Sequence, residues 1–136
     1  MRQYSVDDKG VEHIVRLYIE NWWASDRESY INLTPSKYNI DAWEDSEVLL
    51  LTKADFINHL SKIPAVNETM RKMDENFAIA TQNRLASISL SAEERYIELI
   101  KTYPEFIQRF PQHIIASYLG ITKETLSRVR NQAMKR

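Results

Sequence analysis

The chain has 136 residues, 43% of them hydrophobic and 27% charged, which is the balance of a folded soluble protein with one ordinary domain or two small ones. It contains no cysteine, so disulfide bridges, thiolate metal sites and cysteine-held iron–sulfur clusters are excluded. No apolar run reaches membrane-spanning length and Met1-Arg2 opens no signal peptide, so we expect a cytoplasmic protein with no membrane contact.

The first twenty residues predict a β-hairpin. Arg2 to Val6 reads as a strand, and residues 7–10 read as a turn in which Gly10 occupies a position that tolerates positive φ. The side chains of residues 11–19 then alternate with the two-residue period of a second strand. Two such strands joined by a tight turn are typical of a hairpin.

The next thirty residues predict more of a small β-structure. Residues 22–30 are compatible with a short helical turn, and Pro35 marks a loop because proline fixes φ and removes a hydrogen-bond donor. Residues 38–43 and 46–51 each read as a strand, joined at residues 44–45. We therefore expect two further strands beside the hairpin.

A short helix and a long helix follow. Thr52 is a predicted N-cap, with Asp55 three residues later to reach back to it, and Pro64 suits the first turn of a helix over about 65–89. The narrow apolar stripe of this helix predicts packing against a second copy of itself in a dimer, with packing against the chain's own sheet as the alternative. The predicted dimer residues are Met70, Met73, Phe77, Ala80, Arg84 and Ile88.

A further helix begins at a capping box. In Ser91-Ala92-Glu93-Glu94 the serine and a glutamate can satisfy the free amides of a helix start. The helix should end before Pro104, because the residue before a proline avoids the helical region. Residues 86–91 are therefore the expected domain junction.

Residues 111–130 read PQHIIASYLGITKETLSRVR and carry the clearest functional pattern. Ala116 is small where two helices must cross closely, and Gly120 suits a sharp chain reversal in the left-handed region. Thr122 can cap the helix that follows. These features are typical of a helix-turn-helix. The residues after Thr122 include five basic side chains and one acidic one, a balance that favours DNA.

The segment ASYLGITKETLSRVR, residues 116–130, resembles the helix-turn-helix of the Crp/Fnr family of transcriptional regulators. The resemblance implies an α+β fold in three parts. Residues 1–63 would form a partial cyclic-nucleotide-binding-like β-roll with a short helix, 64–90 a long dimerisation helix, and 91–136 a helix-turn-helix domain of winged-helix type. We expect the first strands of the roll, and the wing strands that usually follow the motif, to be missing.

The resemblance also implies the DNA contacts and the partners. Lys123 and Arg128 would donate hydrogen bonds to guanine, while Glu124 would accept one from a cytosine amino group. The residues expected to touch phosphates or to position the motif are Gln112, Thr122, Thr125, Ser127, Arg130 and Asn131. The implied partners are double-stranded DNA carrying a palindromic site and a second copy of the chain, and RNA polymerase is a further candidate.

Residues 1–63, the sensor-like part, lack residues that form the nucleotide pocket of the family. The places of its Gly-Glu pair and of its arginine fall near Ser25-Asp26 and Ser36-Lys37, which lack the glycine and the guanidinium. We therefore expect no cofactor, and an effector that is not cyclic AMP. Trp22, Trp23 and Lys37 are the candidate effector pocket, although aromatic side chains in a β-roll are more often part of the core.

An enzyme and an interaction protein are the two other classes of function that we compare with a regulator. An enzyme is disfavoured, because His13, His59 and His113 lie on separate elements without metal-ligand spacing, and no glycine-rich phosphate loop is present. We accordingly assign no catalytic or metal-binding residue. The alternative is an interaction protein that dimerises through residues 65–89 with a full-length family member and does not bind DNA itself.

Overall fold

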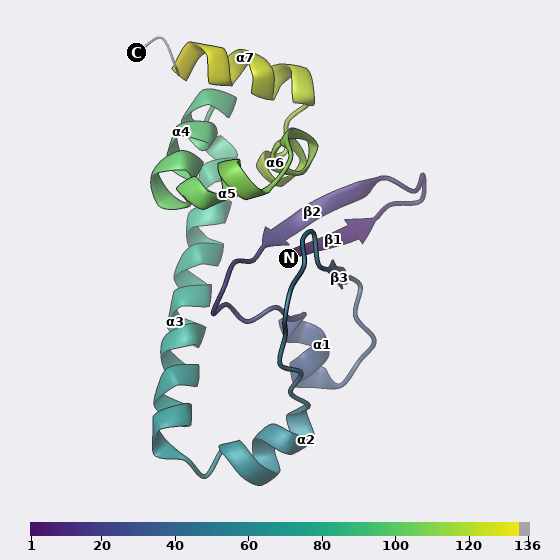
Figure 1. Cartoon of the computed structure of the whole chain (residues 1–136), viewed down its shortest axis with the longest axis vertical. Coiled ribbons are helices and arrows are strands. Elements are labelled where there is room, and N and C mark those ends of the chain that lie inside the picture. The colour runs from purple at the N-terminus through teal and green to yellow at the C-terminus, as the bar shows by residue number, and fades with distance from the viewer. Residues whose placement is uncertain (134–136) are drawn as a thin grey trace. The chain divides into compact units, whose positions relative to one another are not determined.

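The computed structural model describes residues 1–133 and confirms an α+β architecture, with a three-stranded antiparallel sheet and seven α-helices in that range (Figure 1). The chain forms two compact units. One contains residues 1–46 together with the residues from 91 onward, and the other contains residues 47–90. The boundary after residue 90 coincides with the predicted one, whereas the first boundary falls after residue 46 and not after residue 63, and the N-terminal sheet shares a unit with the C-terminal helices.

The sheet begins with the predicted hairpin of β1 (Arg2–Val6) and β2 (Glu12–Leu17). β3 (Asn39–Asp41) pairs antiparallel with the other edge of β1, which gives the order β2-β1-β3. The register of the hairpin shifts between Gln3 and Tyr4. Such a bulge breaks the strict alternation of side chains, so Ile14 and Leu17 are both buried despite their odd spacing.

The predicted strand over residues 46–51 is wrong. These residues form neither strand nor helix, and the side chains of Leu49 and Leu50 are 99% and 93% exposed. A strand needs a neighbouring backbone to receive its N–H and C=O groups, and apolar composition alone does not supply one. For the same reason β3 covers only Asn39–Asp41 of the strand predicted over 38–43.

A short helix, α1 (Arg27–Asn32), lies between β2 and β3 in the sequence. Its N-cap is Asp26, whose carboxylate accepts hydrogen bonds from the backbone N–H groups of Glu28 and Ser29. The helical turn predicted within residues 22–30 is therefore confirmed, although it starts later and continues to Asn32.

The second unit contains helical segments. They are α2 (Lys53–Asp55), the π-helical turn η1 (Phe56–Leu60), α3 (Pro64–Ala86) and the 3₁₀ turn η2 (Ser87–Ser89). Thr52 caps α2 as predicted, with its hydroxyl oxygen accepting from the Asp55 N–H at 3.0 Å. α3 ends three residues before the predicted boundary, so Ile88 lies in η2 and outside the helix. The hydroxyls of Ser87 and Ser89 donate to carbonyls of the preceding turn, a local hydrogen bond that competes with helix continuation.

The C-terminal helices start at α4 (Ala92–Thr102), where the predicted capping box is confirmed. The Ser91 hydroxyl accepts from the Glu94 N–H at 3.2 Å, and the Glu94 carboxylate accepts from the Ser91 N–H at 2.8 Å. The prediction missed α5 (Pro104–Arg109). Pro104 stops α4, but a proline also fits the first turn of a helix, where its absent N–H is not needed.

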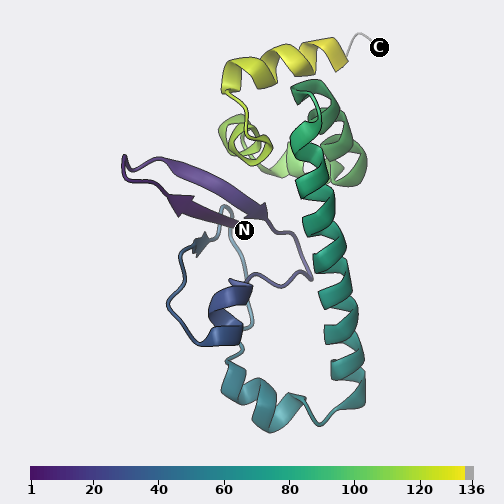
Figure 2. The ribbon, with the colours of Figure 1, turned by 180° about the vertical axis from the view of Figure 1, so that it is seen from behind.

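The core of the first unit combines the sheet with four helices. Ile14 and Leu17 of β2 belong to the same buried cluster as side chains of α4, α5, α6 (Gln112–Leu119) and α7 (Lys123–Ala133). β2 lies beside α6 in the views from the front and from behind (Figure 1, Figure 2). α6 is therefore packed both by the sheet and by the neighbouring helices. Within residues 1–133, no helix has the length and apolar character needed to cross a membrane.

Candidate nucleic-acid interface

A tight turn joins α6 to α7 and has the geometry that the sequence predicts. Gly120 adopts the left-handed conformation, with φ 67° and ψ 37°, which a residue without Cβ reaches without strain. The Ile121 N–H donates to the Ala116 carbonyl at 3.0 Å and closes the turn. Thr122 then caps α7, because its hydroxyl oxygen accepts from the Thr125 N–H at 3.2 Å.

Buried side chains fix how the two helices cross. α6 buries Ile114, Ile115, Ala116 and Leu119, and α7 buries Leu126 and Val129. These residues recur at helical spacing, so each helix has one face in the core and another face outside it. The outer face of α7 is therefore held in a defined orientation by the packing of its inner face.

An open groove of about 740 Å³ runs along the outer face of α7. It is lined by one residue of α6 and six of α7, which are Gln112, Lys123, Glu124, Ser127, Arg128, Asn131 and Gln132. We call it the α7 groove. Its α7 residues fall in two rows at four-residue spacing, 123-127-131 and 124-128-132, so that each row runs along one side of the helix. Such a row extends about 12 Å, or roughly three to four base-pair steps of DNA.

The α7 groove brings together most of the predicted DNA-contacting residues. Lys123, Glu124 and Arg128 line it, and so do three of the predicted positioning residues, Gln112, Ser127 and Asn131. The sequence prediction missed Gln132. It follows Arg128 by four residues and Glu124 by eight, so helical spacing alone could have found it.

Three other predicted positioning residues have different surroundings. The Thr122 hydroxyl donates to the Thr125 hydroxyl oxygen at 3.2 Å, so both side chains belong to the cap of α7. Arg130 lines a small hollow of about 20 Å³ with Tyr96, Ile107 and Phe110 among its neighbours. Their contacts with phosphate stay predictions. Lys135 and Arg136, which contribute to the basic end of the sequence, lie outside the described residues.

The polar groups of the α7 groove suit hydrogen bonding to base edges. Lys123 and Arg128 are exposed and offer cationic donors. A hydrogen bond from the Glu124 backbone amide is the main cause that lowers the pKa of the Glu124 carboxyl, so it is ionised and accepts hydrogen bonds at neutral pH. The remaining side chains are amides and a hydroxyl, which both donate and accept. This combination can recognise donors and acceptors in the major groove of DNA.

Two residues of the predicted effector pocket, Trp22 and Lys37, have protein neighbours. The Trp22 ring meets the rings of Tyr103 and Phe106 edge-on, with centroids 5.5 and 6.1 Å apart. The Lys37 ammonium forms an ion pair with Glu28 at 3.1 Å. Trp23 is 47% exposed. Trp22 is nevertheless 42% exposed, so it packs beside Tyr103 and Phe106 without being buried, and its role in an effector pocket stays a prediction.

The residues of the predicted dimer helix form a partly sheltered stripe on α3. Met70, Met73, Phe77 and Ala80 are half-buried, whereas Arg84 is exposed, and so is Ile88 in η2. Charged residues occupy other positions of the helix: Arg71 forms ion pairs with Glu68 and Glu75, and Lys72 forms one with Glu68. α3 therefore separates an apolar stripe from a charged surface.

Comparison with known proteins gives a similarity to a regulator. No established family profile matches the sequence. In an alignment of 100 positions that covers 65% of this chain, the sequence is 28% identical to the transcriptional regulatory protein btr of Bordetella pertussis. The matched region spans 41% of the length of that protein. The match therefore covers less than half of that regulator.

Proposed function

We propose that this chain is a sequence-specific DNA-binding regulator of transcription, of the Crp/Fnr type, in which α6 and α7 are the helix-turn-helix. The observation that carries the proposal is the α7 groove. Its six α7 residues all offer hydrogen-bonding groups, and they lie on the one face of the helix that the core leaves outside. The similarity to a transcriptional regulatory protein supports the same function.

In this proposal α7 enters the major groove and reads base edges. Arg128 and Lys123 donate to guanine, and the Glu124 carboxylate accepts from a cytosine amino group. Ser127 and Asn131 follow in the second and third turns, within reach of phosphate oxygens or further bases. Gln112 approaches the adjacent phosphate backbone from the start of α6. The proposal assigns no catalytic residue, and the effector is not cyclic AMP.

The proposal includes a dimer formed through α3. Val66, Met70, Met73, Phe77 and Ala80 follow one another at alternating spacings of four and three residues, and all five are half-buried. This repeat is typical of helices that pair in a left-handed coiled coil. The unit of residues 47–90 contributes none of the fully buried hydrophobic residues among those described. A second copy of α3 would cover the stripe and place two reading helices on one duplex.

Selection of preferred sites from a pool of random duplexes tests the proposal. We expect a palindrome whose half-sites lie about one helical turn apart, because a two-fold dimer presents two copies of α7 to one face of DNA. The affinity for the selected site should fall steeply with salt. If the chain binds no duplex even at low salt, the DNA-binding function is wrong and the interaction-protein alternative is favoured.

Phe77→Glu tests the dimer. A buried carboxylate in each copy of an apolar seam is strongly unfavourable, so we expect the variant to sediment as a monomer at concentrations at which the unmodified chain is a dimer. Ile79→Glu is the matched control, since Ile79 lies on the same helix, is 57% exposed and is outside the repeat. A Phe77→Glu chain that still sediments as a dimer would place the subunit contact elsewhere.

A further inference from the structure

The N-terminal segment contacts both ends of α6. Near the last turn, the Ser117 hydroxyl oxygen accepts a hydrogen bond from the Ile14 N–H at 3.0 Å, and the hydroxyl donates to the Glu12 carbonyl at 3.5 Å. In the first turn, the His113 ring meets the Trp43 ring edge-on, with centroids 5.6 Å apart. These contacts join residues that are 103, 105 and 70 positions apart in the sequence.

The Ser117 hydroxyl makes hydrogen bonds to the backbone of β2 of the kind that a neighbouring strand would make. β2 is an edge strand, since the order is β2-β1-β3, and its outer N–H and C=O groups have no strand to pair with. Ser117 satisfies one donor and one acceptor on that edge. Because Ile14 is 5% exposed, its N–H has little access to water, and removal of the hydroxyl would leave a buried donor unpaired.

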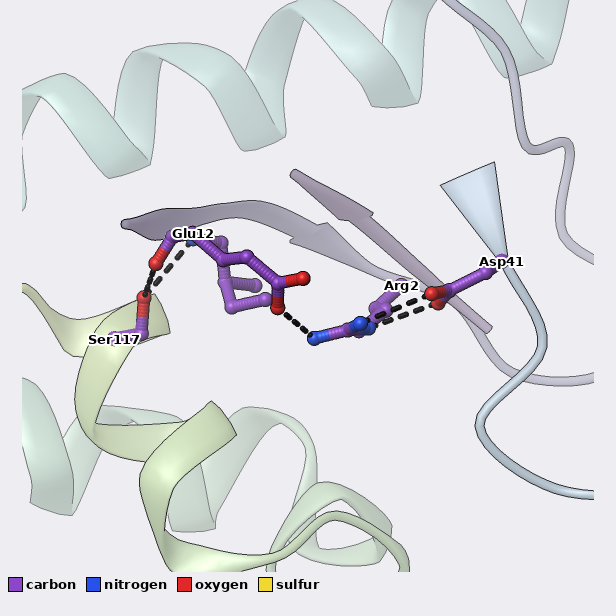
Figure 3. A network of polar contacts seen from close by, with 5 residues as sticks. Arg2, Glu12, Asp41 and Ser117 are labelled. Carbon is purple, nitrogen blue, oxygen red and sulfur yellow. Dashed lines mark hydrogen bonds and ion pairs between the residues drawn. The ribbon is translucent and has the colours of Figure 1, made fainter. Parts of the chain in front are cut away.

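Arg2 connects the strands of the sheet to one another and so stabilises the sheet that makes these contacts (Figure 3). Its guanidinium donates to both carboxylate oxygens of Asp41, at 2.8 and 2.9 Å, and to the Glu12 carboxylate at 2.6 Å. It therefore ties β3, β1 and β2 together. The Arg2 side chain is only 11% exposed and lies over the rings of Tyr4 and Trp43.

One buried arginine thus organises both attachments of α6. Glu12, which it binds, offers its carbonyl to Ser117, and Trp43, which it overlies, contacts His113. His113 is adjacent to Gln112, the residue through which α6 lines the α7 groove. A shift of α6 on the sheet would therefore move Gln112 relative to α7.

We propose that the N-terminal sheet is part of the DNA-binding unit, and that Ser117 is a positioning residue whose hydroxyl seats α6 on β2 and thereby places Gln112 against DNA. This inference rests on the proposed function of the α7 groove. It assigns residues 1–46 a role in DNA binding, in addition to any role in sensing. Ser117 touches no DNA in this scheme and acts through α6.

A double-mutant cycle between Ser117 and Gln112 tests the coupling. We expect Ser117→Ala to weaken binding to the selected site about fivefold, and Gln112→Ala to weaken it by a similar factor. If Ser117 acts by placing Gln112, the double variant should bind no more weakly than the weaker single variant. Ser117→Thr keeps the hydroxyl and should restore binding. Lys123→Ala on α7 is the control, and its effect should multiply with that of Ser117→Ala.

The position of α6 can also be read without DNA. Because the His113 ring lies 5.6 Å from the Trp43 ring, we expect it to shift the NMR resonance of the Trp43 indole N–H. Trp22→Phe and Trp23→Phe would distinguish this resonance from those of the other two indoles. Ser117→Ala should move this resonance in the folded state, and Ser117→Thr should return it. A variant that is merely less stable would lower the folded population and leave the resonance in place.

The outcomes separate the two proposals. If the Trp43 resonance does not move in Ser117→Ala, or if the effects of Ser117→Ala and Gln112→Ala simply multiply, the positioning role is wrong while DNA binding stands. If the resonance moves but no duplex is bound, the sheet positions α6 and the proposed function is wrong.

Discussion

Arg128→Ala is expected to weaken binding to the selected site by about 10- to 100-fold. Arg128 is exposed on α7 and lies in the middle of the row formed by Glu124, Arg128 and Gln132 in the α7 groove. A guanidinium at this place can donate two parallel hydrogen bonds to one guanine, and an alanine replaces neither. The dissociation constants can be measured by fluorescence anisotropy with a labelled selected duplex and a scrambled one.

Arg130→Ala is the matched control for this prediction. It removes the same charge from the same helix, but Arg130 lies beside Tyr96 and Phe110 and does not line the α7 groove. We expect it to weaken binding to both duplexes by a similar, smaller factor, because lost phosphate attraction does not depend on sequence. If Arg128→Ala also weakens both duplexes equally, Arg128 contacts only phosphate and its assignment as a base-reading residue is wrong.

The parts of the fold that the sequence predicts are those set by local chemistry. Thr52, Ser91 and Thr122 each cap a helix as expected, because a hydroxyl that accepts from an amide two or three residues later needs no distant partner. Gly120 adopts the left-handed conformation for a similarly local reason. The α7 groove was predictable to the same degree, since its rows follow from the helical period once the boundaries of α7 are known.

The parts that the sequence does not predict depend on distant contacts. Ile14 and Leu17 fit a strand in any sheet, and nothing near them specifies that they pack against α6. In the sequence Ser117 resembles an ordinary exposed helix residue, and only the fold shows that β2 lies beside it. Residues 46–51 have the composition of a strand but no neighbouring strand to pair with, so β propensity alone misled the prediction.

Phe106→Ala is expected to lower the free energy of unfolding by about 3–5 kcal/mol. The Phe106 side chain is 1% exposed and lies at the centre of an aromatic cluster. Its ring centroid is 4.9 Å from that of Tyr103, 5.7 Å from that of Phe110, and 6.1 Å from those of Trp22 and Tyr118. Alanine would leave a cavity among four rings that cannot all move inward, so both transfer free energy and packing are lost.

Urea denaturation followed by tryptophan fluorescence and far-UV circular dichroism measures this effect. Phe56→Ala is the control, because Phe56 is half-buried and lies in the other unit. This substitution should lower the free energy of unfolding by less than about half as much as Phe106→Ala does. Equal losses in the two variants would contradict a core centred on Phe106.

The same measurement shows whether the sheet and the helices unfold together. Trp22 belongs to the N-terminal segment, yet it packs on Phe106 of α5, so its fluorescence reports contact between the two parts of the unit. Phe106→Ala should shift the fluorescence and helical transitions of that unit to lower urea together. Since domains are commonly stable by only about 5–15 kcal/mol, the variant should also lose DNA binding on warming and regain it on cooling. If the fluorescence changes at clearly lower urea than the circular dichroism of the helices, the N-terminal segment detaches on its own. In that case α6 and α7 fold without it.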